Sequence, residues 1–312
     1  MKVFLAGGNG AVGRRLIPQL IEAGHEVVAT TRSARNEAAL RELGAEPAIV
    51  DGLDEAAVVK AVERAAPEVV IHEMSALSGK VDMRHFDRWF ATTNELRTRG
   101  TDYLIAGARR GGARRLIAQS YTGWSNIREG GPVKTEDDPL DPDPPKAQRE
   151  TLAGIRYLEA AVTGAEGLEG IALRYGGLYG PGTNTSNEIA EMVRKRRMPT
   201  VGDGGGIWSW IHVDDAASAT VAALDRGEPG VYNIVDDEPA PASAWLPYMA
   251  ETLGAKPPFR LPVWIARIAA GEVAVSMMTR IRGSSNEKAK RELGWQPRYA
   301  SWRDGFRESA HA

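Results

Sequence analysis

The chain of 312 residues contains no cysteine, which excludes disulfide bonds and thiolate chemistry. Its five histidines are scattered, and no spacing of histidines and carboxylates suggests a metal site. No apolar run approaches the length that spans a bilayer, and residues 1–5 are too short an apolar stretch for a signal peptide. The formal charge of −2 gives no attraction to nucleic acid or anionic lipid. We therefore expect a cytoplasmic protein that acts on a small molecule, with no metal, no nucleic-acid partner and no membrane anchor.

What the sequence does contain is an alternation of short β-branched runs and longer helical patterns. Hydrophobic residues make up 43% and charged residues 26%, which is ordinary for a globular protein with a sizeable core. The predicted strands are residues 2–6, 26–31, 46–50, 68–72, 114–118 and 170–174, with helices such as 11–23 and 54–66 between them. Strands separated by helices predict a Rossmann-type α/β fold, a doubly wound parallel sheet.

The second half of the chain is organised differently. Residues 130–145 are so rich in proline that they predict an ordered loop or lid without a strand ladder or a helix. Residues 207–213 and 231–235 are predicted as further strands, and a mostly helical tail follows them. We therefore expect a nucleotide-binding core over 1–175, to which 207–235 returns, and a smaller C-terminal substrate-binding lobe over 176–312.

A glycine-rich turn follows the first strand and opens the first helix. Glycine is needed where the chain turns sharply and where the backbone approaches a pyrophosphate, and the helix N-terminus offers N–H groups to that anion. A glycine-rich turn without a ligand is the alternative, but the position between a strand and a helix favours dinucleotide binding. The residues expected to hold the pyrophosphate are Gly7, Asn9, Gly10, Ala11, Val12 and Gly13.

The end of the second strand indicates which dinucleotide is bound. A carboxylate there would bond the ribose hydroxyls of NAD, whereas this strand ends in Thr31 and Arg32, with Arg35 shortly after. Guanidinium groups suit a 2′-phosphate, so NADP(H) is favoured over NAD(H), although Glu37 and Glu42 could instead pair with the arginines. Asp51 after the third strand could accept from the adenine amino group, with Gly52 beside it, or could cap the next helix.

With these residues in view, the chain resembles the extended short-chain dehydrogenase/reductases, in particular the NAD(P)-dependent epimerase/dehydratase family. The likeness runs nearly end to end and includes the strand at 69–72, the segment 173–182, the helix start at 211–217, where Asp214 is expected to cap, and the signature at 288–297. The resemblance implies that further residues line the cofactor, namely Met74, Ser75, Asn94, Gln119, Tyr175, Gly177 and Leu178. It also implies a homodimer through the helices that flank the fifth strand.

The catalytic motif of that family is absent. The family carries Tyr-x-x-x-Lys on the helix after the irregular loop, where the tyrosine exchanges a proton with the substrate and the lysine lowers its pKa. The corresponding positions here are Thr151 and Ile155, and no Tyr-x-x-x-Lys occurs anywhere in the chain. The family's helix asparagine aligns nearer to Arg97 than to Asn94.

Tyr121, at the end of the fifth strand, is the best substitute for the missing acid, with Ser120 just before it. An unassisted tyrosine is a fair acid and a poor base at neutral pH, which favours the reductive direction. The alternative is that Tyr121 packs with Trp124 as a pocket wall. Tyr157 is expected in the core, Arg174 in a structural role that ties its strand to the following loop, and Lys146 in solvent.

These observations lead to three hypotheses. The first is an NADP-dependent reductase of a small carbonyl or activated alkene, with Tyr121 as proton donor. The second is an epimerase, dehydratase or isomerase that retains its nucleotide, which would still need a base. The third is a non-catalytic protein that senses NADP(H).

Overall fold

A seven-stranded parallel sheet forms the centre of the protein in a computed structural model, which describes residues 1–77 and 81–311. The strands are arranged in the order β12-β7-β5-β4-β1-β2-β3. The order reverses at β1, and a doubly wound sheet binds ligands beyond the carboxyl ends of its strands at such a switch point. Their bounds are β1 Lys2–Ala6, β2 Glu26–Thr31, β3 Glu46–Ile49, β4 Val69–His72, β5 Arg115–Tyr121, β7 Glu169–Tyr175 and β12 Gly230–Ile234.

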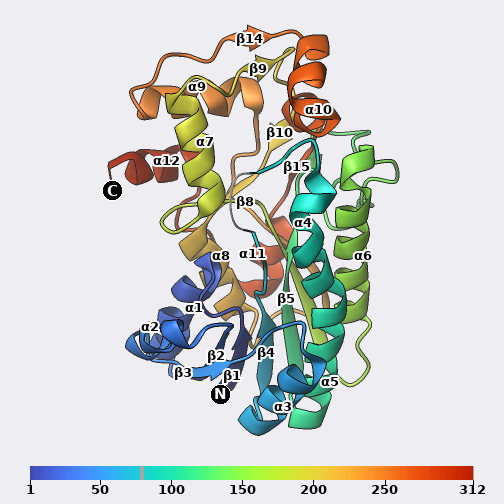
Figure 1. Cartoon of the computed structure of the whole chain (residues 1–312), viewed down its shortest axis with the longest axis vertical. Coiled ribbons are helices and arrows are strands. Elements are labelled where there is room, and N and C mark those ends of the chain that lie inside the picture. Colours follow the sequence, from blue (N-terminus) through green and yellow to red (C-terminus); the bar gives the residue numbers. More distant parts are fainter. Residues whose placement is uncertain (78–80, 312) are drawn as a thin grey trace.

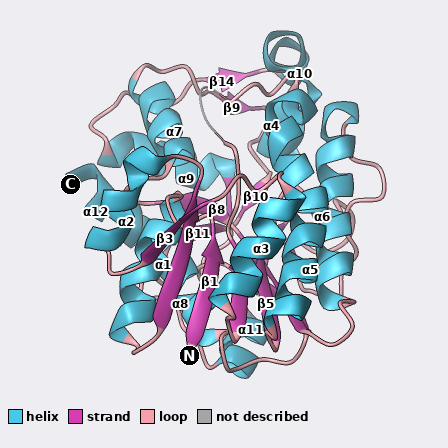
Figure 2. Cartoon of the chain, turned by 60° about the horizontal axis from the view of Figure 1, so that its bottom comes forward, coloured by secondary structure: helices cyan, strands magenta, loops and turns pink. Residues whose placement is uncertain are grey.

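Helices cover both faces of the sheet, and each face has its own apolar core (Figure 2). One face packs against α1 (Ala11–Glu22) and α8 (Val213–Ala222), whose contacts with each other are extensive. The other face packs against α3 (Glu55–Ala65), α5 (Thr101–Gly111) and α6 (Arg149–Thr163). Strands buried on both sides must be almost entirely apolar, and β1 and β4 satisfy this requirement.

A smaller lobe lies beyond the carboxyl ends of the strands, at the end of the molecule opposite the N-terminus (Figure 1). It contains α7 (Asn184–Arg194), α9 (Ala242–Thr252), α10 (Val263–Thr279) and α12 (Trp302–His311). Its core is built on tryptophans 210, 245 and 302. Short strands join the segments of this part of the chain: β6 Val133–Lys134, β8 Gly177–Tyr179, β9 Thr200–Val201, β10 Ile207–Trp208, β11 Trp210–His212, β13 Ala240–Pro241, β14 Arg260–Leu261 and β15 Gly283–Ser284.

Three further α-helices complete the described fold. α2 (Glu37–Glu42) lies between β2 and β3, and α11 (Glu287–Leu293) packs into the core of the main sheet. α4 (Phe86–Glu95) follows β4 and continues into a π-helical turn, η2, over Leu96–Gly100. A π-turn widens the helix by one residue and is frequent at functional sites. Here it precedes α5 without an intervening loop.

The predicted strands of the sheet agree with the structure to within a few residues, and residues 231–235 correspond to β12. Residues 207–213, predicted as a strand, form two short strands broken at Ser209, which pair outside the main sheet, β10 with β13 and β11 with β8. One prediction in the second half was wrong. The proline-rich segment contains a ladder after all. Its Val133–Lys134 pairs with β15, since the prolines flank these two residues and leave their N–H groups free.

The described helices contain none that is long and apolar enough to cross a bilayer.

Candidate functional site

The glycine turn is shaped by close packing as well as by backbone conformation. Gly7 adopts a φ of +100°, and a Cβ at this residue would lie 2.5 Å from the carbonyl oxygen of Glu73. A Cβ on Gly13 would lie 2.4 Å from the carbonyl oxygen of Gly7, and one on Gly8 would lie 2.7 Å from the Cβ of Ala29. The turn therefore tolerates no side chain at three of its positions, and α1 begins directly against the end of β1.

The N-terminus of α1 is left open for an anion. Gly10 is its N-cap residue without a side-chain cap, and no acidic residue lies in the first turn. The helix dipole and the first N–H groups are thus unopposed by protein charge. Arg14 stays next to the turn by donating from Nε and Nη2 to Asn9 Oδ1, at 3.1 and 2.9 Å. A pocket of about 540 Å³ opens here, lined by Asn9, Ala11, Arg14, Arg15, Ala39, Glu42, Leu43, Pro181 and Gly182.

The end of β2 presents two arginines to solvent. Arg32 and Arg35 are exposed, and neither forms an ion pair with any residue that the structure describes. Glu37 pairs instead with Arg41 at 3.0 Å. The Thr31 hydroxyl accepts from Ser33 N and from the side chain of Asn36. The two guanidinium groups are therefore free to receive a phosphate.

The loops after β3 and β4 contribute the adenosine side of the predicted site. Asp51 is exposed and its carboxylate accepts from Leu53 N at 3.1 Å, while Asp54 caps α3, so Asp51 is not the cap. Gly52 is buried, and a Cβ there would lie 2.4 Å from the sulfur of Met74. Ser75 is exposed just beyond. The close approach of Gly52 and Met74 brings the loop after β3 against the loop after β4.

The two predicted catalytic residues at the end of β5 have different surroundings. Ser120 is buried and donates to Glu159 Oε1 at 2.7 Å, and Arg174 holds the same carboxylate through two bonds of 2.7 Å. Arg174 therefore ties β7 to α6, not to the loop that follows the strand as predicted. Ser120 belongs to this buried cluster. Gln119 and Tyr121 flank Ser120 in the strand, and both are half-buried.

Tyr121 faces an aromatic wall. Its ring stacks on Trp124 with centroids 5.6 Å apart, and the same apolar cluster contains Phe86, Phe90 and Ile155. Burial raises the pKa of the Tyr121 phenol well above its usual value, and the nearby charge of Arg97 opposes this shift. The phenol is therefore protonated at neutral pH and can donate a proton but not accept one.

The position of the family tyrosine holds a hydroxyl that is already fully engaged. Thr151 is buried, and its Oγ1 donates to Asp87 Oδ1 at 2.6 Å and accepts from Asn94 Nδ2 at 3.2 Å. The same carboxylate accepts from the backbone N–H groups of Glu150 and Thr151, so Asp87 of α4 caps α6. Asn94, expected to line the cofactor, thus bonds to the side chains of Thr151 and Arg97. Ile155 fills the lysine position and is fully buried.

Arg97 is a residue of this site to which the sequence analysis gave no role. It lies in η2, only 7% exposed, with its guanidinium over the ring of Phe90 at 5.4 Å. The one hydrogen bond that its guanidinium makes within the described part of the chain runs from Nη1 to Asn94 Oδ1 at 3.3 Å. Burial lowers the pKa of Arg97 to about 10, and the charge of Glu159 opposes that shift. The alignment of Arg97 with the family's helix asparagine was the one feature of the sequence that could have indicated a role for it at the site.

Beneath the glycine turn lies a buried carboxyl, which we also did not single out from the sequence. Burial raises the pKa of Glu73 to about 8, against an opposing hydrogen bond from Tyr175. The phenol oxygen of Tyr175 lies 2.8 Å from Glu73 Oε1 and 2.6 Å from the hydroxyl of Thr220. The Tyr175 side chain is thus buried behind the turn, whereas the half-buried Gly177 and Leu178 lie in β8.

Two further local predictions were wrong. His212, not Asp214, caps α8, because its Nδ1 accepts from Asp214 N at 3.2 Å, and Asp214 pairs with Arg15 at 3.3 Å. Tyr157 is 43% exposed and bonds to the carboxylate of Asp102, because the buried face of α6 follows residues 152, 155, 158 and 162. Lys146 is exposed, as predicted, and lines a pocket of about 350 Å³ between the start of α4 and Gly271 of α10.

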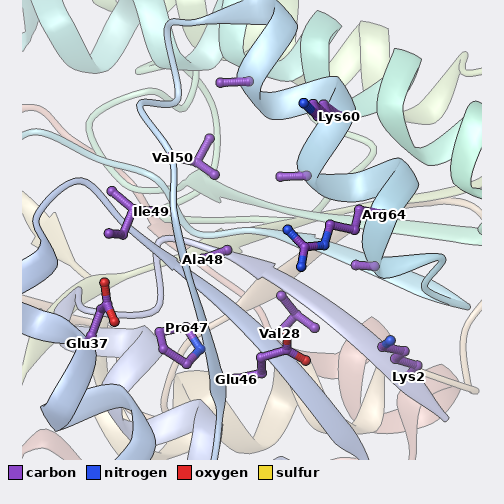
Figure 3. A pocket seen from close by; sticks show the side chains of 13 residues that line it. Lys2, Val28, Glu37, Glu46, Pro47, Ala48, Ile49, Val50, Lys60 and Arg64 are labelled. Carbon is purple, nitrogen blue, oxygen red and sulfur yellow. The ribbon is translucent and has the colours of Figure 1, made fainter.

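A separate recess of about 480 Å³ lies on the α3 face of the sheet, beside the edge strand β3 (Figure 3). The recess exists because small alanine side chains of β3 and α3 line it, and Lys60 and Arg64 of α3 lie at its border. None of its lining residues belongs to the glycine turn or to the cluster around Tyr121. We therefore place the candidate active site at the carboxyl ends of β1, β4 and β5.

Residues 3–235 match the model of the NAD dependent epimerase/dehydratase family. The chain belongs to this family. The resemblance noted in the sequence and the Rossmann-type fold are therefore confirmed. A Thermus thermophilus UDP-glucose 4-epimerase in complex with NAD has the same fold, with 26% identity, a TM-score of 0.75 and coverage of 100% of this chain and 98% of that one. A human epimerase family protein with NADPH gives a TM-score of 0.75 at 18% identity, covering 100% of this chain and 99% of that chain.

Two relatives within the family are named reductases. A Streptomyces 3-diazoavenalumate denitrifying reductase is 41% identical over 98% of this chain and 99% of its own length. A 2-alkyl-3-oxoalkanoate reductase of Stenotrophomonas maltophilia is 30% identical over 82% of this chain and 76% of its own length. These relatives bear out the predicted reaction class, an oxidoreductase of this family. The solved relatives carry NAD or NADPH, which supports a nicotinamide nucleotide as cofactor.

Proposed function

We propose that this protein is an NADPH-dependent reductase that transfers hydride to a small, largely apolar and strongly electrophilic acceptor. The observation that carries the proposal is the replacement of the tyrosine and lysine by Thr151, whose hydroxyl is fully bonded, and Ile155, which is apolar. These two replacements still allow hydride transfer from the cofactor. They do remove the groups that usually transfer a proton to and from the substrate oxygen.

The acceptor must then need little help from an acid. A ketone that accepts hydride becomes an alkoxide, which must then be protonated. An arenediazonium ion already carries a positive charge and becomes neutral when it accepts hydride. Hydride adds to its terminal nitrogen to give an aryl diazene, which loses N2 as its C–N bond breaks and its proton becomes the new C–H hydrogen. The diazo compound in the name of the 41% identical relative is of this kind. The aromatic wall of Phe86, Phe90 and Trp124 suits a planar ring.

The second candidate keeps Tyr121 as proton donor to a carbonyl or activated alkene, as the oxoalkanoate reductase name suggests. The protonated, buried phenol is suited to donate once after hydride transfer. An epimerase would need a base in the other half of its cycle, which this phenol cannot supply. Conversion of a substrate without net redox change, on cofactor that copurifies with the protein, would support the epimerase.

One panel of acceptors separates these candidates. The purified protein is mixed with NADPH and arenediazonium salts, enones, aldehydes and β-keto acids, and loss of NADPH absorbance and release of N2 are measured. We expect turnover of diazonium compounds that is kept in Tyr121→Phe. Turnover of carbonyls that falls at least about 100-fold in Tyr121→Phe would establish the second candidate instead. NADPH binding without turnover of any acceptor would point to a sensing protein.

We further propose that NADP(H) is preferred to NAD(H). The support is the pair of exposed guanidinium groups, Arg32 and Arg35, and the absence of a carboxylate at the end of β2. Replacing both arginines by alanine should weaken NADPH binding about 10- to 100-fold, because charge-assisted phosphate contacts contribute about 1.5–3 kcal/mol. Calorimetry with NADH is the control, and an equal loss for both nucleotides would contradict the preference.

A cytoplasmic homodimer completes the proposal. The family resemblance suggests an interface on α5 and α6, and the exposed Tyr157 bonded to Asp102 lies on these two helices. Light scattering on the eluted protein tests the mass, and Tyr157→Glu, which opposes Asp102 with a like charge, should shift a dimer toward monomer. A monomeric wild type would refute it.

A further inference from the structure

The guanidinium of Arg97 is buried in the candidate site with few compensating contacts. A buried cation is stable only when opposite charges and hydrogen bonds compensate for the loss of water. Arg174, nearby, is compensated in this way, with two bonds of 2.7 Å to a carboxylate. Arg97 has one bond of 3.3 Å to a neutral amide and the face of one phenyl ring. The charge of Glu159 acts on it only through space, because Ser120 and Arg174 bind that carboxylate.

The unused donors of Arg97 are not sealed in the protein. The side chain makes no other hydrogen bond in the described part of the molecule, and none of its nitrogens is among the buried atoms that lack a partner. Its remaining N–H groups therefore reach accessible space. That space adjoins Phe90 of the aromatic wall and Tyr121. The charge of Arg97 is close enough to Tyr121 to affect the pKa of its phenol.

The surrounding residues explain why the cation can lie here. Ile155 leaves no second cation at the position of the family lysine, so Arg97 meets no like charge from α6. The π-turn η2 carries the residue, and Asn94, one turn earlier, steers its Nη1 while bonding Thr151 on its other side. The positive charge at the site thus comes from η2, which continues α4, and not from α6, where the family carries its lysine.

We propose that Arg97 binds an anionic oxygen of the substrate, a carboxylate or phenolate close to the atom that accepts hydride. A guanidinium with free N–H groups in an apolar surround binds such an oxygen through forked, charge-assisted bonds. The proposal rests on the proposed reductase and narrows its substrates to electrophiles that carry an acidic oxygen. The relatives named for a diazo-carboxylate and an oxoalkanoate are consistent with this class.

4-Nitrophenol tests the proposal without turnover, because its phenolate is coloured and its neutral form is not. The protein saturated with NADP⁺ is titrated with this probe, and nitrobenzene serves as the neutral analogue. We expect the wild type to bind the phenolate form and to lower the pKa of the bound phenol. Arg97→Met should lose at least about tenfold in phenolate affinity while nitrobenzene binding stays unchanged. Arg97→Lys should recover part of the loss.

Arg99→Met is the matched control, because it removes an exposed arginine from the same π-turn, where its Nε bonds only Tyr103. This variant should retain the wild-type spectrum. Since Arg97 is poorly compensated, Arg97→Met should keep or raise the melting temperature, which a purely structural arginine would not allow.

Three results would overturn the assignment: an unchanged phenolate affinity in Arg97→Met, a melting temperature that falls in step with the affinity, or a loss confined to NADP(H) binding. The last would show that the guanidinium holds the cofactor. Intact phenolate binding with no reductase activity would refute the proposed function but not the anion site.

Discussion

Glu73 should make the stability of this protein fall as the pH rises from 5 to 8. The carboxyl is buried next to Gly7 of the glycine turn, and its folded pKa is about 8 against a usual value of 4.5. The folded state then holds a proton that the unfolded state releases. Stability from this group is complete below pH 4.5 and is lost as the pH rises toward 8.

The surroundings of Glu73 do not replace the water that its carboxylate loses. Tyr175 Oη donates to Glu73 Oε1 at 2.8 Å, and Glu73 Oε2 is buried with no partner among the described residues. A carboxylate with one neutral donor and one unpaired oxygen is poorly stabilised, which favours the protonated form.

The expected magnitude follows from the pKa difference. Each pKa unit corresponds to about 1.4 kcal/mol, so Glu73 should remove about 3–4 kcal/mol of stability between pH 5 and pH 8. Glu73→Gln cannot ionise, and its amide oxygen can accept from Tyr175 as the acid does. The variant should therefore be similar to the wild type at pH 5 and more stable by about 3–4 kcal/mol at pH 8.

Urea unfolding at several pH values measures this difference, because the other titrating groups contribute equally to both proteins. Glu63→Gln, which removes an exposed carboxylate of α3, is the control and should leave the pH profile unchanged. His72, whose pKa burial lowers to about 4, reduces stability below pH 6.5 in all variants alike. Parallel profiles for wild type and Glu73→Gln would refute the reasoning.

The remaining predictions concern the turn, the buried ion pair and the lysine position. Gly13→Ala should abolish nucleotide binding in calorimetry, because its Cβ would lie 2.4 Å from Gly7 O; micromolar binding by the variant would show that the turn can rearrange. Glu159→Gln should cost about 3–5 kcal/mol in urea unfolding, since it leaves Arg174 buried and uncompensated; a loss below 1 kcal/mol would mean that water replaces the carboxylate. Ile155→Lys should destabilise the protein strongly by placing a second cation near Arg97, and less in an Arg97→Asn background; additive losses would show that the two positions do not interact.

The parallel sheet could be predicted from the sequence because each of its strands is an apolar run bounded by turn residues. β1 and β2 matched the prediction residue for residue. The glycine turn was equally accessible, since glycine at positions 7 and 13 reflects a local steric demand. The short strand pairs of the C-terminal lobe could not be foreseen. β6 pairs with β15, about 150 residues later, and two residues carry no periodic signal.

The chemistry of the site was less accessible because it depends on contacts between elements distant in sequence. Ser120 was a reasonable catalytic candidate until its distance to Glu159, 39 residues later, assigned it to a buried cluster. Tyr157 was placed in the core from its helical neighbours, but the packing direction of α6 turned it outward. Local pattern alone cannot distinguish a side chain that a partner engages from one that is free.

The changes at positions 97, 151 and 155 are easier to understand together than separately. A lysine at 155 beside Arg97 would bury two like charges, so an arginine at 97 favours an apolar residue at 155. Without that lysine, a tyrosine at 151 would lose the charge that makes it a proton acceptor, and Thr151 instead joins Asp87 to Asn94. The residues at these three positions together keep a positive charge at the site but no longer provide a reversible proton transfer. That combination suits an enzyme that delivers hydride in one direction to an acceptor whose activation comes from its own electrophilicity.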